Sequence, residues 1–93
     1  MAVGLILDYK GGTLDQYDRI SEMMPGAGGR VPPGAIFHWV AATDGGVRVV
    51  DVWEDRATFD KFAEEWLDPF SADVGAPQPE ITEYAVHNML APE

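Results

Sequence analysis

Runs of apolar and polar residues divide the chain into segments of strand and helix length. Residues 2–9 are apolar at nearly every position, which is typical of a central strand covered on both faces. Thr13 and Gln16 have the spacing of a helix-capping box, and the apolar positions after them recur at helical spacing. The pattern therefore predicts a first strand at 2–9 and an amphipathic helix at 14–24.

Two β-rich runs, at residues 35–43 and 47–54, are joined by Asp44, Gly45 and Gly46. An Asp-Gly step between such runs is a strong signal for a β-hairpin. The sequence therefore predicts a hairpin here, and we take its register to be the one that pairs Thr43 with Val47.

That register assigns each strand residue to one face of the sheet. Trp39 and Asp51 share one face, whereas His38 lies on the other face with Arg48 at its end. A slip of one residue would exchange the two faces. The expected pairs are Phe37 with Trp53, Trp39 with Asp51 and Ala41 with Val49 on the first face, and His38 with Val52 and Val40 with Val50 on the second.

The second half of the chain predicts another helix and a last strand. Asp55 is a suitable N-cap, and Pro69 is expected to end the helix. Asp68 and Pro69 then have the pattern that opens a short extra helical turn, through Val74. After a loop at 75–79, alternating residues predict a strand at 81–90. The apolar stripe of the helix consists of Phe59, Phe62, Ala63, Trp66 and Leu67.

These elements follow the order β-α-β-β-α-β, the ferredoxin-like arrangement of an α+β fold. We expect a single domain over residues 1–93, with a four-stranded antiparallel sheet and the helices on one face. The second face of the sheet also carries large apolar side chains, which a monomer would leave in water. The sequence therefore predicts a homodimer in which two such faces pack about a two-fold axis.

Composition and charge restrict the partners. The 93 residues include 16 acidic and 6 basic side chains and no cysteine, and the formal net charge is −10. The lack of cysteine excludes disulfides and thiolate metal sites, and two histidines alone make a poor metal site. The negative charge argues against nucleic acid and anionic membranes as partners. The apolar N-terminal run is too short for a signal peptide or a membrane span, so we expect a cytoplasmic protein.

Residues 25–34 are rich in glycine and proline, and the stretch Gly-Ala-Gly-Gly-Arg within them has the composition of a phosphate-binding loop. A phosphate-binding loop follows a strand and opens a helix, whereas this segment leaves a helix and enters a strand. We therefore reject that interpretation and expect a long loop, a feature that is often functional.

The stretch VVDVWED at residues 49–55, followed by Phe59 and Phe62, resembles the dimeric α+β barrel superfamily and, within it, the antibiotic-biosynthesis-monooxygenase-like proteins. Members of that superfamily include cofactor-free monooxygenases, haem-degrading oxygenases, polyketide cyclases and lactone isomerases. The resemblance implies the fold and the dimer but not the reaction. The haem-ligating histidine near the second helix and the His-Pro-x-His stretch of plant-type polyketide cyclases are both missing from this sequence.

His38, Asp51 and His87 are the candidate catalytic residues. An imidazole suits general acid–base catalysis, but His38 could equally bond a neighbour or the dimer partner. A carboxylate among valines is costly unless it is paired, so Asp51 could bond an arginine or an indole across the dimer, or act as an acid or base. His87 could converge with His38 or lie at the opposite end of the sheet.

The aromatic residues are expected mostly in the core, where together they could line a flat pocket between sheet and helices, with Met23 and Met24 at its mouth. No cofactor motif is present, and we expect neither a cofactor nor a metal. The candidate substrate-binding residues are Trp39, Trp53, Trp66, Tyr84, Phe62 and Tyr9, with Phe59 beside them.

Three functional hypotheses remain open. The first is a small cofactor-independent enzyme, of monooxygenase, cyclase or isomerase type, acting on a polyketide-like or aromatic molecule. The alternative is a non-catalytic dimeric module that binds a small apolar ligand or a partner. The third is a structural protein with a filled core. The first requires titratable groups inside a pocket, the second a pocket without them, and the third no pocket at all.

Overall fold

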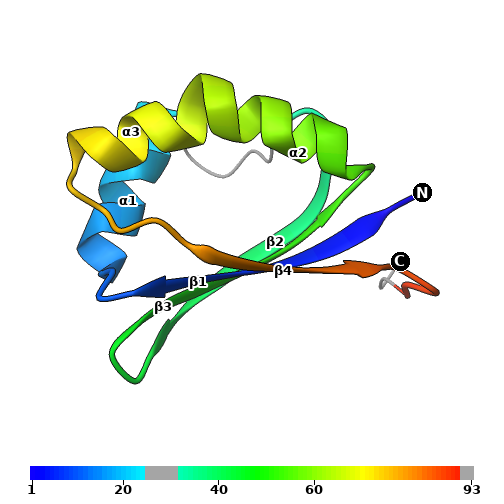
Figure 1. Cartoon of the computed structure of the whole chain (residues 1–93), viewed down its shortest axis with the longest axis horizontal. Coiled ribbons are helices and arrows are strands. Elements are labelled where there is room, and N and C mark those ends of the chain that lie inside the picture. Colours follow the sequence, from blue (N-terminus) through cyan, green and yellow to red (C-terminus); the bar gives the residue numbers. More distant parts are fainter. Residues whose placement is uncertain (25–31, 91–93) are drawn as a thin grey trace.

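The computed structural model describes residues 1–24 and 32–90, which form an antiparallel sheet with helices across one face (Figure 1). The strands lie in the order β2-β3-β1-β4, so the first strand is central, as its continuous apolar run predicts. The predicted ferredoxin-like α+β fold is confirmed. The elements are β1 (Val3–Lys10), α1 (Leu14–Met23), β2 (Ala35–Thr43), β3 (Gly46–Trp53), α2 (Arg56–Phe62), a π-helical segment η1 (Ala63–Leu67), α3 (Asp68–Asp73) and β4 (Glu80–Ala85).

Both predicted helix starts are confirmed by their capping hydrogen bonds. The backbone N–H of Gln16 donates to the Thr13 hydroxyl at 3.1 Å, and the Gln16 side-chain oxygen accepts from the Thr13 N–H at 3.1 Å. At the second start, the Asp55 carboxylate accepts from the Thr58 N–H at 2.7 Å. These bonds satisfy backbone donors that a helix N-terminus otherwise leaves without partners.

The predicted register of the β2–β3 hairpin is wrong by one residue. Thr43 pairs with Gly46 rather than with Val47, so only Asp44 and Gly45 form the turn. Gly45 has a φ of 89°, a left-handed conformation that favours glycine and suits a two-residue hairpin turn. In this register His38 lies opposite Asp51.

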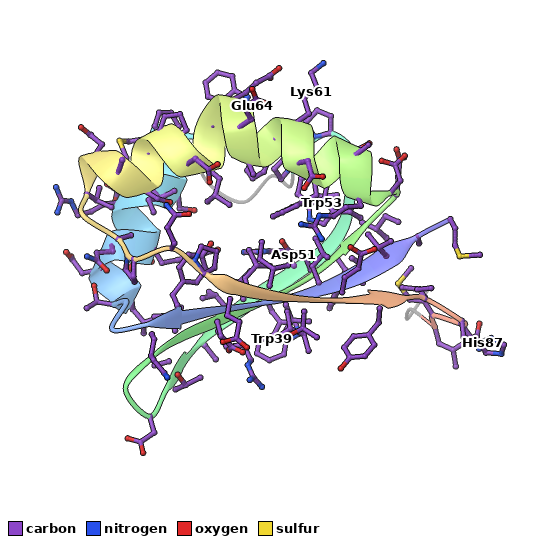
Figure 2. The ribbon with its side chains drawn as sticks, in the orientation of Figure 1. Trp39, Asp51, Trp53, Lys61, Glu64 and His87 are labelled. Carbon is purple, nitrogen blue, oxygen red and sulfur yellow. The ribbon has the colours of Figure 1, made fainter. Side chains whose placement is uncertain are left out.

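The corrected register exchanges the faces of the β2 residues relative to those of β3, as a slip of one position must. Asp51 and Trp53 point toward the helices, whereas Trp39 points away from them on the uncovered face (Figure 2). Trp39 pairs with Val50 instead of with Asp51. An irregularity between Ala35 and Phe37 shifts the pairing again near the start of β2.

We expected Pro69 to end the second helix, but the helix continues past it. The chain stays helical from α2 through η1 into α3, and α3 is the short turn that the Asp68–Pro69 pair predicts (Figure 1). The Asp68 N–H bonds the carbonyl of Ala63, five residues back, which is π-helical geometry. Pro69 stands at the start of α3, directly after this π-helical turn, and the helix continues past it although proline has no N–H to donate.

The last strand is shorter than predicted, because β4 ends at Ala85 and not at residue 90. Ala85 pairs with Val3, the first residue of β1, so the neighbouring strand ends at this point. One further bond, from the Val86 N–H to the Ala2 carbonyl at 3.0 Å, continues the ladder. Residues 86–90 therefore lie beyond the sheet.

The core lies between the sheet and the helices. Leu5, Leu7, Trp53 and Phe59 are fully buried there, and the Trp53 and Phe59 rings meet edge to face with centroids 5.4 Å apart. The glycine- and proline-rich loop predicted at 25–34 falls mostly outside the described residues. Within the described part of the chain, no helix is long and apolar enough to span a bilayer.

Two leucines allow a matched test of this core. Leu5 in β1 has no exposed surface, whereas Leu14 at the start of α1 is 44% exposed. We expect Leu5→Ala to lower the free energy of unfolding by about 2–5 kcal/mol, because it leaves a cavity. Leu14→Ala should change it by less than about 0.5 kcal/mol. Urea denaturation of both variants measures the difference, and equal losses would contradict the assignment of the core.

Candidate active site

A pocket of about 360 Å³ opens between the helix-covered face of the sheet and the helices. The strands supply its floor and the helices its roof, with Pro32, Pro33, Ala76 and Pro77 at the loop ends. Most of the wall is apolar or aromatic, which is usual for a small-molecule site. The third hypothesis, a filled core without a pocket, is therefore wrong. Side chains in the wall include Leu7, Tyr9, Tyr17, Ile20, His38, Val47, Val49, Asp51, Trp53, Phe59, Phe62 and Trp66.

His38 and Asp51 meet at the wall of this pocket, because the two-residue turn places them opposite each other on β2 and β3. The Nδ1 atom of His38 lies 2.5 Å from Oδ1 of Asp51. The Asp51 side chain is 9% exposed and the His38 side chain 32% exposed. The carboxylate is thus buried, while the imidazole has one edge open.

Asp51 receives a second hydrogen bond, from within its own strand. The indole Nε1 of Trp53 donates to Oδ2 at 3.1 Å. Residues two apart on a strand point to the same face, so this bond follows from the local geometry of β3. The sequence left open an indole or arginine partner across the dimer; the structure supplies an indole from the same chain. Both oxygens of the buried carboxylate are satisfied, which offsets the cost of its burial.

Tyr17 of α1 is the fourth residue of this hydrogen-bonded group, which also contains His38, Asp51 and Trp53. Its hydroxyl lies 2.5 Å from Nε2 of His38, and the two rings stack with centroids 5.8 Å apart and an interplanar angle of 12°. An ionised carboxylate only accepts, so we assign a proton to Nδ1 of His38. In the neutral imidazole Nε2 then accepts from the Tyr17 hydroxyl. The network runs from Tyr17 through His38 to Asp51.

Burial raises the pKa of the Tyr17 phenol; the hydroxyl of Ser21 opposes this rise and the nearby Asp51 charge adds to it. Burial also raises the pKa of Tyr9 strongly, with the charges of Asp51 and Asp68 adding to the effect. Both phenols therefore remain protonated at neutral pH and can donate hydrogen bonds.

The pocket wall contains no lysine or arginine among the described residues. Arg48 is exposed and forms an ion pair with Asp8 at 2.7 Å. Arg56 bonds Asp60 and Glu83 on the protein exterior. Among the described residues, Asp51 is the one acidic side chain in the pocket wall.

The structure divides the predicted site residues into two groups. Tyr9, Trp53, Phe62 and Trp66 line the pocket with His38 and Asp51, and Phe59 and Met24 also reach it. Trp39 and Tyr84 do not line it, since Trp39 points to the open face of the sheet and Tyr84 is 61% exposed. His87 lies on the segment after β4, exposed and far from Asp51 (Figure 2). Of the two placements that the sequence left open, convergence of His87 with His38 does not occur.

Tyr17 was missed as a functional residue by the sequence analysis. It belongs to the apolar stripe of α1, where a tyrosine is normally assigned to the core. A signal was available, because a buried phenol usually has a hydrogen-bond partner. Gln16 was read only as a cap, yet its side-chain amide also donates to the Gly75 carbonyl at 3.3 Å and holds the loop beside the pocket.

Within residues 1–24 and 32–90, no three His, Cys, Asp or Glu side chains gather in a way that could hold a metal ion. The polar groups of the pocket can instead accept, hold and pass on a proton. His38, paired with Asp51, has the chemistry of a proton acceptor, and the Tyr17 hydroxyl lies against its free nitrogen, Nε2.

Comparison with known proteins supports the fold. No family model and no curated protein matches the chain. Its structure is similar to that of a variant of SnoaB, a cofactor-independent oxygenase from Streptomyces nogalater, with a TM-score of 0.61, 13% identity and coverage of 96% of this chain and 95% of that chain.

It is also similar to a protein from Deinococcus radiodurans whose assignment as an antibiotic biosynthesis monooxygenase is provisional. The TM-score is 0.50 and the identity 8%, over 100% of this chain and 99% of that chain. The chain thus has the fold of the antibiotic-biosynthesis-monooxygenase-like proteins, as the resemblance of residues 49–55, Phe59 and Phe62 implied.

Substitution of Asp51 tests the hydrogen-bond network. In Asp51→Asn the amide oxygen can still accept from Trp53, but the amide N–H then faces Nδ1 of His38. We expect the imidazole to move its proton to Nε2, and the free energy of unfolding to fall by about 1 kcal/mol as charge-assisted bonds become neutral ones. Nitrogen-15 NMR of the imidazole detects the tautomer, and urea denaturation the stability.

Asp44→Asn, at the exposed tip of the hairpin, makes the same chemical change outside the network. It should leave the His38 tautomer as it is in the wild type. An unchanged Nδ1–H tautomer in Asp51→Asn would contradict the assigned network.

Proposed function

We propose that this protein is a small cofactor-independent enzyme that removes a proton from a neutral aromatic or polyketide-like molecule. The observation that carries the proposal is the hydrogen-bonded His38–Asp51 pair at the wall of an apolar pocket. Asp51 would stabilise the imidazolium that forms when His38 gains a proton. A paired imidazole in a largely apolar site is a common arrangement for general base catalysis.

The composition of the wall supports a flat and uncharged ligand. Trp53, Trp66 and Phe62 offer aromatic surfaces, and the described wall has no cationic side chain to pair with a carboxylate or phosphate. An anionic ligand would also be repelled by Asp51. A neutral molecule with an acidic C–H or O–H group meets both conditions, and it becomes an anion only after the proton leaves.

The carbanion or enolate formed in this way has three fates: reaction with dioxygen, cyclisation or isomerisation. The similarity to SnoaB, a cofactor-independent oxygenase, favours the first, although at 13% identity it supports the fold rather than the reaction. All three begin with deprotonation, so the first step is what the geometry of His38 and Asp51 supports. We propose that the reaction takes place in the cytoplasm, the compartment that the sequence predicts.

The proton transfer can be measured with anthrone, a flat neutral ketone with one acidic CH2 group. The wild type should accelerate the loss of deuterium from the labelled CH2 group above the rate in buffer. His38→Gln should reduce this acceleration by about 10²-fold or more, because it removes the base. Quenching of the fluorescence of the two pocket tryptophans measures binding independently.

His87→Gln is the matched control, since it removes the other imidazole of the chain, which lies outside the pocket. It should exchange deuterium at the wild-type rate. Wild-type rates in His38→Gln would show that His38 is not the base. Binding of anthrone without any accelerated exchange by the wild type would instead favour the alternative, a non-catalytic module that binds small ligands.

We also propose that the protein acts as a homodimer through the uncovered face of the sheet. Trp39 is 47% exposed and Phe37 49% exposed on this side, and Val50 and Val52 lie between them and β1. A patch of large apolar side chains of this kind usually has a partner. A second copy presents the same surface, and the resemblance to dimeric α+β barrels supports this arrangement.

The dimer is tested with two substitutions that introduce the same charge. Trp39→Lys should shift the mass in solution from that of a dimer toward that of a monomer, because it places an ammonium group in the proposed interface. Glu64→Lys, on the outer side of the helices, should keep the wild-type mass (Figure 2). Sedimentation equilibrium measures both, and a monomeric wild type would contradict the proposal.

A further inference from the structure

Tyr17 occupies the position that a substrate of His38 would need. Nε2 is the only nitrogen of His38 that is not committed to Asp51, and the Tyr17 hydroxyl lies 2.5 Å from it. The two rings are nearly parallel, with an interplanar angle of 12° and centroids 5.8 Å apart, so the phenol lies end-on to the edge of the imidazole that carries Nε2. A substrate therefore meets the Tyr17 oxygen before it can reach Nε2, unless the phenol moves.

The protons in the network already have the order that a relay requires. Trp53 can only donate and Asp51 accepts through both oxygens, so His38 carries its proton on Nδ1. Tyr17 then donates to Nε2. The phenolic oxygen can still accept a hydrogen bond or a proton while its own proton points to Nε2. Tyr17 lines the pocket together with Ser21, which lies one turn further along α1.

We infer that Tyr17 is a further catalytic residue, whose oxygen takes the substrate proton while its own hydroxyl proton passes to Nε2 of His38. The inference rests on the proposed deprotonation by His38 and Asp51 and specifies its first contact with the substrate. The substrate C–H or O–H bond breaks and its electron pair stays on the substrate. A new O–H bond forms on Tyr17 and a new N–H bond on His38, so the phenol is neutral before and after the step.

The fixed geometry explains why a phenol can serve in this position. Free phenolate never has to form, because the two protons move together and the charge appears on the imidazole beside Asp51. Partial burial raises the pKa of the Tyr17 phenol, which therefore does not oppose the step and keeps the hydroxyl proton available at neutral pH. Stacking on His38 holds the ring in place.

Tyr17→Phe separates this relay from direct contact between substrate and His38. The variant keeps the aromatic ring and removes one oxygen atom. With anthrone as the probe, the relay predicts that kcat for deuterium loss falls by about 10²-fold, whereas KM changes by less than about threefold. If Tyr17 only covers His38 and moves aside, kcat stays the same or rises, and the inference is wrong.

The solvent isotope effect gives a readout that a structural role of Tyr17 would not change. In the relay an exchangeable proton, that of the Tyr17 hydroxyl, moves in the same step as the substrate proton. With tritium as the label in the CH2 group, release of tritium by the wild type should therefore be slower in D2O than in H2O, and Tyr17→Phe should lose this effect. Direct transfer from carbon to His38 moves no exchangeable proton, so a wild-type rate that is equal in H2O and D2O would overturn the relay.

Nitrogen-15 NMR tests the resting relay without any substrate, with His87→Gln used to assign the His38 signals. We expect a proton on Nδ1, and an Nε2 resonance that shifts in Tyr17→Phe because its hydrogen bond is lost. A proton on Nε2 in the wild type would overturn the relay even if deprotonation by His38 is correct. A wild type that neither accelerates exchange nor depends on His38 would overturn the proposed function together with the relay.

Discussion

The arrangement of the pocket depends on one buried charge, the carboxylate of Asp51. It accepts from the imidazole of His38 and the indole of Trp53, so both oxygens are satisfied inside a largely apolar wall. A carboxylate in this position is costly without such partners. The same two bonds orient His38 and hold Trp53 against Phe59. The burial of Asp51 therefore links the stability of the core to the chemistry of the pocket.

The turn between β2 and β3 decides whether this network exists. With Asp44 and Gly45 as the two turn residues, His38 faces Asp51; with a third residue in the turn, Trp39 would take that place. The sequence predicted the hairpin but not this register, for a physical reason. Asp44-Gly45-Gly46 permits turns of either length, and β2 carries large side chains on both faces, so alternation alone does not identify the buried one.

Local signals in the sequence predicted the helix starts, the order of helices and strands along the chain and the fold class correctly. They failed where a tertiary contact overrides local preference. Pro69 is a helix breaker by itself, but the π-turn before it lets the helix continue. For the site, sequence reasoning selected His38 and Asp51 separately and did not place them in contact. The phenol of Tyr17 signalled a hydrogen-bond partner, but which partner depends on how α1 crosses β2, and this is a property of packing and not of spacing along the chain.

The edge strand β2 contributes one residue to each of the two functional surfaces of the sheet, the pocket and the uncovered face. β2 pairs only with β3, and its neighbouring residues His38 and Trp39 point to opposite sides, one into the pocket and the other to the uncovered face. An edge strand is held on one side alone and is less constrained than a central strand. A second copy packed on Trp39 would restrict β2 and thereby the position of His38 relative to Asp51 and Tyr17. Association through one face of the sheet would in that case contribute to the order of the catalytic group on the other, without any partner residue entering the pocket.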